Sequence, residues 1–236
     1  MTYPNINWID FSNKFLFTID LNRNKYTTQI DNYENLATVF DCLKRINSVL
    51  IDMCRDIWTY ISMNYLKLKI NKDEVGSSAM PHKVNPINFE NAEGNLMIAN
   101  SLLEFLSRKL PISRLQRDLT DSTVLRNLGT VFGHIVIAFH NIIAGLSKID
   151  INKKKIDIDI SQNIVVIAEG IQVVLKKYGF SDSYEILKKL TRINKHISQN
   201  DLNNFIETLD CSDTVKEELR NISINDYIGY AGDIND

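Results

Sequence analysis

The sequence is poor in the residues that interrupt helices. Its 236 residues include only nine glycines and four prolines, which argues against turn-rich all-β folds, collagen-like repeats and long flexible linkers. The formal net charge is −2, so the basic excess of a dedicated nucleic-acid-binding protein is missing. This length leaves room for one or two domains with a sizeable core.

Cysteines and continuous apolar runs are also scarce. Cys42, Cys54 and Cys211 form no CxxC pair, so neither a disulfide framework nor a zinc site is predicted. Cys42 and Cys54 lie in an apolar helical pattern, where we expect both to be buried. The first ten residues lack the pattern of a signal peptide. No window approaches the roughly 18 uninterrupted apolar residues of a membrane span. We therefore expect a cytoplasmic protein without a membrane partner.

Long helical patterns dominate what is present. Apolar residues spaced by three and four predict a helix over about 33–66, a second from Asn85-Pro86 to just before Pro111, and a third from Thr120 or Asp121 to about 146. Asn85 suits an N-cap and Pro86 the first helical turn. Residues 1–31 read as irregular or short elements, and no strand is predicted.

The expected fold is all-α. Residues 1–148 are predicted to form an elongated bundle of long helices, and residues 149–236 a smaller helical domain. Within the second region, shorter helices are expected at 161–178, 183–191, 198–210 and 212–221, with Ser183 and Ser198 as caps and Gly179 as a stop.

Residues 76–86 read Gly-Ser-Ser-Ala-Met-Pro-His-Lys-Val-Asn-Pro. Glycine and two serines supply a backbone and hydroxyls that can wrap an anion. Lys83 adds a positive charge and Asn85 a neutral donor, just before a helix N-terminus that itself favours negative charge. A serine there could move a proton if nearby positive groups stabilise its alkoxide. The segment predicts a carboxylate site; the alternative is a polar turn between helices.

A second polar cluster spans residues 117–126. Ser122 and Arg126 are four residues apart and share a face near a helix start, and Arg117 comes from the preceding loop. Two guanidiniums and a hydroxyl in this arrangement suit a phosphate. The alternative is that the two arginines pair with Asp118 and Asp121 on the surface.

Residues 76–86 resemble the G-S-S-x-M-P-x-K-x-N-P signature loop of the fumarase/aspartase superfamily. Residues 87–95, 117–126, 26–29 and 226–229, together with His82, resemble the bacterial-type adenylosuccinate lyase family in particular. The resemblance runs along nearly the whole chain, which corresponds to about the C-terminal half of a typical family member. It implies that residues 1–148 are part of the central helical domain and residues 149–236 the C-terminal domain.

The resemblance also implies a carbon-nitrogen lyase of purine biosynthesis. Its members eliminate fumarate from adenylosuccinate to give AMP, and from SAICAR to give AICAR, without a metal or redox cofactor. By the resemblance, Ser77 would be the catalytic base, Lys83 and Asn85 would steady the carboxylate side, and Gln29 would contact substrate. The nucleotide would be bound by Arg117, Ser122, Thr123, Val124, Leu125 and Arg126.

The general acid of the family is a histidine in an upstream Thr-His-Gln-Pro-Ala type motif, which this sequence lacks. His82 is therefore interpreted as structural or substrate-proximal, and His134 and His140 as structural. In the superfamily, different subunits of a homotetramer assemble each site. We therefore predict a homo-oligomer, with a separate N-terminal segment as a further partner, and little or no activity of this chain alone. The alternatives are another superfamily lyase, such as fumarase, aspartase or argininosuccinate lyase, and a non-catalytic helical remnant or assembly module.

Overall fold

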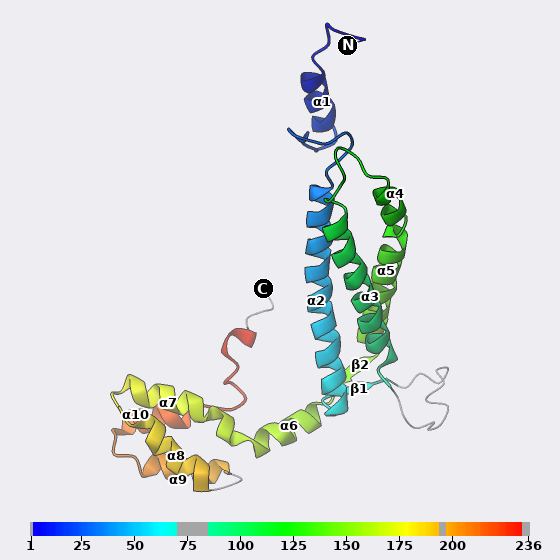
Figure 1. Ribbon diagram of the computed structural model, residues 1–236. Coiled ribbons are helices and arrows are strands. Elements are labelled where there is room, and N and C mark those ends of the chain that lie inside the picture. Colours follow the sequence, from blue (N-terminus) through cyan, green and yellow to red (C-terminus); the bar gives the residue numbers. More distant parts are fainter. Residues whose placement is uncertain (1, 70–84, 194–196, 233–236) are drawn as a thin grey trace. The chain divides into compact units, whose positions relative to one another are not determined.

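Helices account for most of the computed structural model, which describes residues 2–69, 85–193 and 197–232 (Figure 1). The all-α prediction is confirmed, apart from two short strands that pair with each other, β1 (Leu66–Leu68) and β2 (Ile149–Ile151). Strands of three residues are too short for an alternating pattern to reveal them. The chain divides into two units, one of residues 1–62 and 68–149 and the other of residues 63–67 and 150–236.

Three long helices build the first unit. In it α3 (Ile87–Lys109) packs against both α2 (Glu34–Ser62) and α5 (Leu128–Ser147). The second predicted helix is therefore confirmed, and the first ends about four residues early. The third is interrupted, because two residues separate the end of α4 (Thr120–Leu125) from the start of α5. The N-terminal region also contains α1 (Trp8–Phe17), whose start is capped by the Asn7 side chain.

The core of this unit follows a seven-residue repeat. Buried positions on α3 alternate between spacings of three and four, and those on α5 do the same. This is the pattern with which neighbouring helices interlock their side chains at a small crossing angle. The buried residues that follow this repeat are Phe89, Ala92, Leu96, Ala99, Leu103 and Leu106 on α3, and Val131, Ile135, Ala138, Ile142 and Gly145 on α5.

Gly145 permits the closest of these helix contacts. A Cβ atom at this position would lie 2.7 Å from Cζ of Phe89, a ring that is itself buried. We expect Gly145→Ala to lower the free energy of unfolding by about 1–3 kcal/mol, because the ring must shift in a packed core. Urea unfolding of the chain measures this change.

Gly133 on the same helix is the matched control. A Cβ atom there would meet nothing within 4 Å, so Gly133→Ala is expected to stabilise the chain by about 0.5–1 kcal/mol through helix propensity alone. Equal effects of the two substitutions would contradict the close approach of Phe89 to Gly145.

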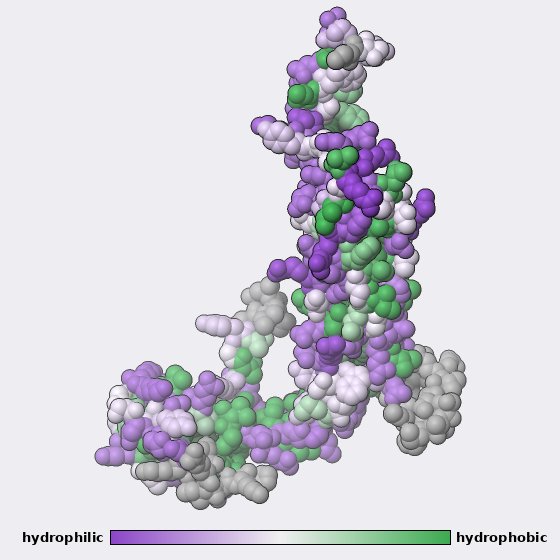
Figure 2. Space-filling model, viewed as in Figure 1, coloured by the Kyte–Doolittle hydropathy of each residue, from purple (hydrophilic) through white to green (hydrophobic). Residues whose placement is uncertain are grey.

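Apolar side chains also line the outside of the bundle, as Figure 2 shows. On α5, Phe132, Val136 and Ile143 are exposed beside the buried stripe. Among the described residues, the stretch Thr120–Ser147 has the length and composition of a membrane span, and the bent pair Lys153–Gln162 and Ile164–Lys177 would also qualify if it were one broken span. That is weak evidence, because one face of α5 packs on α3 and core helices of water-soluble proteins share this composition.

The cysteines differ from one another in their surroundings. Cys54 is buried as expected, and burial raises the pKa of its thiol to about 11. Cys42 is exposed, so the expectation that both are buried was wrong for this residue, which lies on the outer side of α2.

The second unit has its own core. Its elements are α6 (Lys153–Gln162), η1 (Ile164–Ile167), α7 (Ala168–Lys177), α8 (Ser183–Ile193), α9 (Gln199–Glu207), α10 (Asp213–Arg220) and η2 (Gly229–Gly232). Ile167, Ile171 and Ile206 are among its buried residues. Ser198 caps α9 through a reciprocal pair of bonds with Asp201, as predicted. Gly179 follows α7 at φ +86°, a conformation that suits glycine as a helix stop.

Candidate active site

Asn85 leads directly into α3. The backbone carbonyl of Asn85 accepts a hydrogen bond from the Ile87 N–H at 2.9 Å, and that of Pro86 accepts one from the Phe89 N–H at 3.0 Å. The capping position is Pro86, without a side-chain bond, so the prediction of Asn85 as the N-cap was wrong. Its half-buried amide does not cap the helix. Ser77, Lys83 and His82 lie outside the described residues.

A shallow groove lies beside the first turns of α3. Its cavity volume is about 350 Å³, and it is lined by Arg55, Trp58 and Thr59 from α2 and by Glu90 and Glu93 from α3. The Trp58 indole N–H donates to Glu90 Oε1 at 2.9 Å, and Arg55 Nε donates to Glu93 Oε1 at 2.7 Å. Glu90 is not among the residues that the sequence predicted for a site. Its position on the first turn of α3, five residues after Asn85, could have indicated that it lies beside the predicted carboxylate site.

Asp118 organises the start of the second cluster. Its Oδ1 atom accepts a hydrogen bond from the Thr120 N–H at 3.0 Å, and this bond holds the pKa of the carboxyl below its usual range. Arg114 lies 3.5 Å from the same carboxylate. The capping position of α4 is Leu119, without a side-chain bond, so the expectation that Thr120 or Asp121 would cap the helix was wrong; the Thr120 N–H is bound by Asp118 instead.

Asp121 is turned inward. It is 7% exposed; its Oδ2 atom accepts a hydrogen bond from the Tyr33 hydroxyl at 3.1 Å, and Oδ1 accepts one from the Ser122 N–H at 2.8 Å. Burial, followed by this bond to Asp121, raises the pKa of the Tyr33 hydroxyl. No sequence pattern points to Tyr33, because its partner Asp121 is 88 residues away in the chain.

The arginines of this cluster face solvent. Arg117 and Arg126 are exposed, while Asp118 and Asp121 are bound to Arg114 and Tyr33 instead. The alternative interpretation, in which Asp118 and Asp121 pair with Arg117 and Arg126, was therefore wrong. Two positive charges are therefore available to an anion at this end of the bundle.

The remaining predicted residues of this segment differ in what they can offer. The side chains of Ser122 and Thr123 are exposed, whereas Val124 is buried and Leu125 half-buried. Val124 packs in the core of the bundle, so its side chain is not available to a ligand. The Ser122 hydroxyl donates to the Leu119 carbonyl at 2.8 Å and keeps its lone pairs for a further donor.

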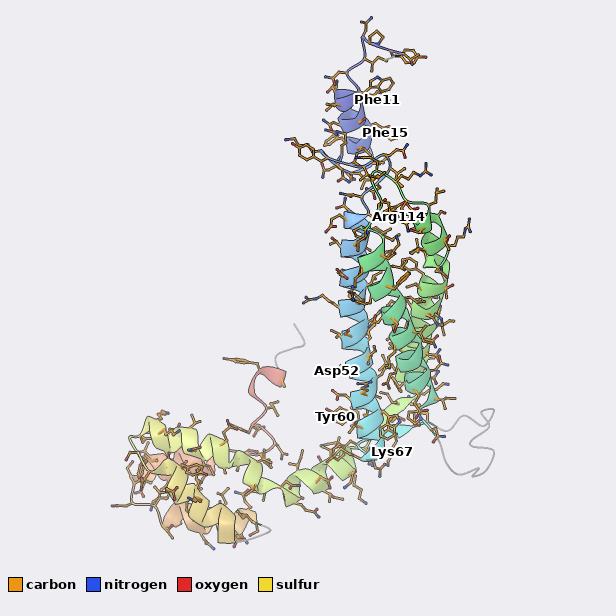
Figure 3. The ribbon with its side chains drawn as sticks, viewed as in Figure 1. Phe11, Phe15, Asp52, Tyr60, Lys67 and Arg114 are labelled. Carbon is orange, nitrogen blue, oxygen red and sulfur yellow. The ribbon has the colours of Figure 1, made fainter. Side chains whose placement is uncertain are left out.

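The segment that carries Gln29 is linked to this cluster through Tyr33. Its side chain is exposed, and it precedes Tyr33 by only four residues. The bond between Tyr33 and Asp121 thus ties the Gln29 segment to the end of the bundle where α4 begins. Figure 3 labels Arg114 at this end, and Asp52 and Tyr60 towards the other end of α2.

Asn85 and Arg117 lie at opposite ends of α3. Asn85 precedes the helix and Arg117 follows it, and the 23 residues between its bounds span about 34 Å at 1.5 Å per residue. One copy of the chain therefore does not bring Asn85 and Arg117 together at one site.

The comparisons with known proteins agree with this architecture. Residues 10–100 match the family described as Lyase, and residues 113–228 match the family described as Adenylosuccinate lyase C-terminal. A crystal structure of a fumarate lyase:delta crystallin from Brucella melitensis is similar with a TM-score of 0.56 and 19% identity, covering 78% of this chain and 40% of that one. The bundle of long helices thus has the fumarate lyase fold.

Curated relatives narrow the class further. The adenylosuccinate lyase of Dictyostelium discoideum is 52% identical over 99% of this chain and 51% of its own length. That of Escherichia coli strain K12 is 45% identical over 97% of this chain and 50% of its own length. The chain belongs to the adenylosuccinate lyase family of carbon-nitrogen lyases, and it spans about half the length of the curated relatives that it matches.

Proposed function

We propose that the chain is the C-terminal part of an adenylosuccinate lyase, which eliminates fumarate from adenylosuccinate and from SAICAR. The observation that supports this most directly is the exposed pair Arg117 and Arg126, whose neighbouring carboxylates are bound elsewhere. Such a pair suits the phosphate that distinguishes a nucleotide substrate from the substrates of the other lyases.

The chemistry is a β-elimination. Ser77, as an alkoxide, takes the proton from the carbon next to the one that carries the nitrogen. The C–H electrons become the double bond of fumarate, and the C–N bond breaks. The nitrogen leaves as the amino group of AMP, or as the carboxamide nitrogen of AICAR, after it receives a proton from the general acid. Lys83 and Asn85 stabilise the negative charge that develops on the carboxylate side.

The nucleotide is held by the opposite end of the bundle. Arg117 and Arg126 bind the phosphate oxygens, Ser122, Thr123 and Leu125 line the same surface, and Gln29 contacts the substrate. Since α3 separates this end from Asn85, each complete site draws on more than one copy of the chain.

Assembly follows from the same geometry. The exposed apolar residues Phe132, Val136 and Ile143 of α5 suit burial in a homo-oligomer. A segment that corresponds to the N-terminal half of the relatives is a further partner. Residues 1–148 then form part of the central domain and residues 149–236 the C-terminal domain. The assembly acts in the cytoplasm, without nucleic-acid or membrane partners.

Reconstitution tests this function. The purified chain is mixed with the N-terminal half of the Dictyostelium discoideum relative, and AMP and fumarate released from adenylosuccinate are quantified by chromatography. We expect turnover from the mixture and little or none from either part alone.

The other outcomes separate the alternatives. Product from argininosuccinate, aspartate or malate, with none from adenylosuccinate, would indicate a different superfamily lyase. A mixture that associates and releases no product from any of these substrates would indicate a non-catalytic module. Full turnover by the chain alone would refute its dependence on a second segment.

A further inference from the structure

A row of polar side chains runs beside the apolar seam between α3 and α5. On α5 its members recur every seven residues, and on α3 they each precede a buried apolar residue. The row consists of Asn88, Asn91 and Asn95 on α3, His134 and Asn141 on α5, and Lys148 at the C-cap of α5. A seven-residue interval keeps these groups on one side of the contact between the two helices.

Hydrogen bonds connect the row across the seam. Lys148 Nζ donates to Asn88 Oδ1 at 3.2 Å, Asn88 Nδ2 donates to Asn141 Oδ1 at 3.0 Å, and Asn141 Nδ2 donates to Asn91 Oδ1 at 3.0 Å. Asn141 Nδ2 also donates to the Ile137 carbonyl at 3.0 Å. Because an ammonium group only donates and a carbonyl only accepts, these two ends fix the orientation of each amide between them.

The row continues towards the middle of the helices. Asn95 Nδ2 donates to the Asn91 carbonyl at 2.8 Å, so its Oδ1 atom faces His134 Nδ1 at 2.7 Å. This nitrogen therefore carries the proton. One connected set of bonds thus joins the first three turns of α3 to the last four turns of α5.

Asn141 occupies the central place in this row. It accepts a bond from Asn88 and donates one to Asn91, so a single side chain bridges the first two turns of α3. One turn further along α5, Gly145 receives the Phe89 ring. The first turn of α3 is thus held by the packing of the Phe89 ring against Gly145 and by the hydrogen bonds of Asn141.

Apolar packing alone does not define where α3 lies along α5. Alternation of spacings of three and four repeats every seven residues, so a slide of about 10.5 Å would again match apolar positions. A slide of seven residues would put His134 or Lys148 in the place of Asn141, so the bonds that Asn141 makes with the half-buried Asn88 and the exposed Asn91 would be lost. The different side chains along the polar row, rather than its seven-residue spacing, therefore favour one register.

We infer that Asn141 is a positioning residue, which acts through Asn88 and Asn91 to set the place of the first turn of α3 and hence of Asn85. The inference rests on the proposed function for the role of Asn85 in the reaction. Asn141 itself does not touch the substrate.

Asn141→Leu tests the inference, because leucine fills similar space and makes none of the bonds. Asn100→Leu is the matched control: Asn100 Oδ1 accepts a bond from Asn47 Nδ2 at 2.9 Å, also between two helices, but Asn100 is about 22 Å along α3 from Asn85. Hydrogen exchange is followed at the amides of Phe89 and Glu90, which donate to the Pro86 carbonyl. We expect exchange about tenfold faster in Asn141→Leu than in the control.

The second measurement uses the reconstituted lyase. Asn141→Leu is expected to lower kcat about tenfold with little change in KM. In a chain that already carries Asn85→Ala, adding Asn141→Leu should lower kcat no further. Asn100→Leu should lower stability and leave kcat unchanged. Equal exchange in the two variants, or equal kcat, would overturn the inference. If the unsubstituted mixture has no activity, the proposed function fails, and the exchange result still decides whether Asn141 positions the first turn.

Discussion

Ser77→Ala is expected to lower kcat of the reconstituted lyase by about 10³-fold, within the range of about 10²–10⁴ that a positioned acid or base contributes. The substitution removes the oxygen that takes the proton and leaves the charged and amide groups that bind the substrate. KM should therefore change little. Rates of fumarate release at saturating adenylosuccinate measure the effect.

Ser78→Ala is the control, since it removes the same hydroxyl from the next position of the same segment. We expect its kcat to remain within about threefold of the unsubstituted mixture, because a neighbouring hydroxyl that transfers no proton contributes little to the barrier. Equal losses in the two variants would contradict the assignment of Ser77 as the base.

Two inactive variants should restore activity in a mixed oligomer. Because Asn85 and Arg117 lie at opposite ends of α3, the proposed function assigns the part of a site that contains Ser77 and the part that contains Arg126 to different copies. Ser77→Ala and Arg126→Ala are therefore each expected to retain under about 1% of activity, since the proton transfer or the phosphate contact is lost. Coexpression with the N-terminal half should return about a quarter of the sites, because random assembly gives each part intact half the time.

The control is coexpression of Ser77→Ala with a chain that carries both substitutions. No site then contains Ser77, so no activity should return. Rates of AMP formation, normalised to the amount of oligomer, compare the two mixtures. A failure of the first pair to recover, with oligomers formed normally, would mean that one copy supplies both parts and would contradict the separation along α3.

The predictions that held depend on local information. The second helix was placed correctly because its apolar spacing and the breakers Pro86 and Pro111 act within one or two turns. The third helix was predicted as continuous because its apolar spacing runs from Val124 to Leu146 and no proline interrupts it. It is interrupted after Leu125, and α5 has its capping position at Asn127, two residues before Gly129.

By itself, the sequence determined the helical class, the buried stripe of α3 and the two motifs that suggest a dicarboxylate and a phosphate, since each of these depends on residues close together in the chain. Only the tertiary structure decided that Asp121 is bound to Tyr33, that Arg117 and Arg126 are left to solvent, and that α3 separates Asn85 from Arg117. These outcomes depend on which distant segments meet when the long helices pack, and helical periodicity specifies the face of a helix but not its neighbour.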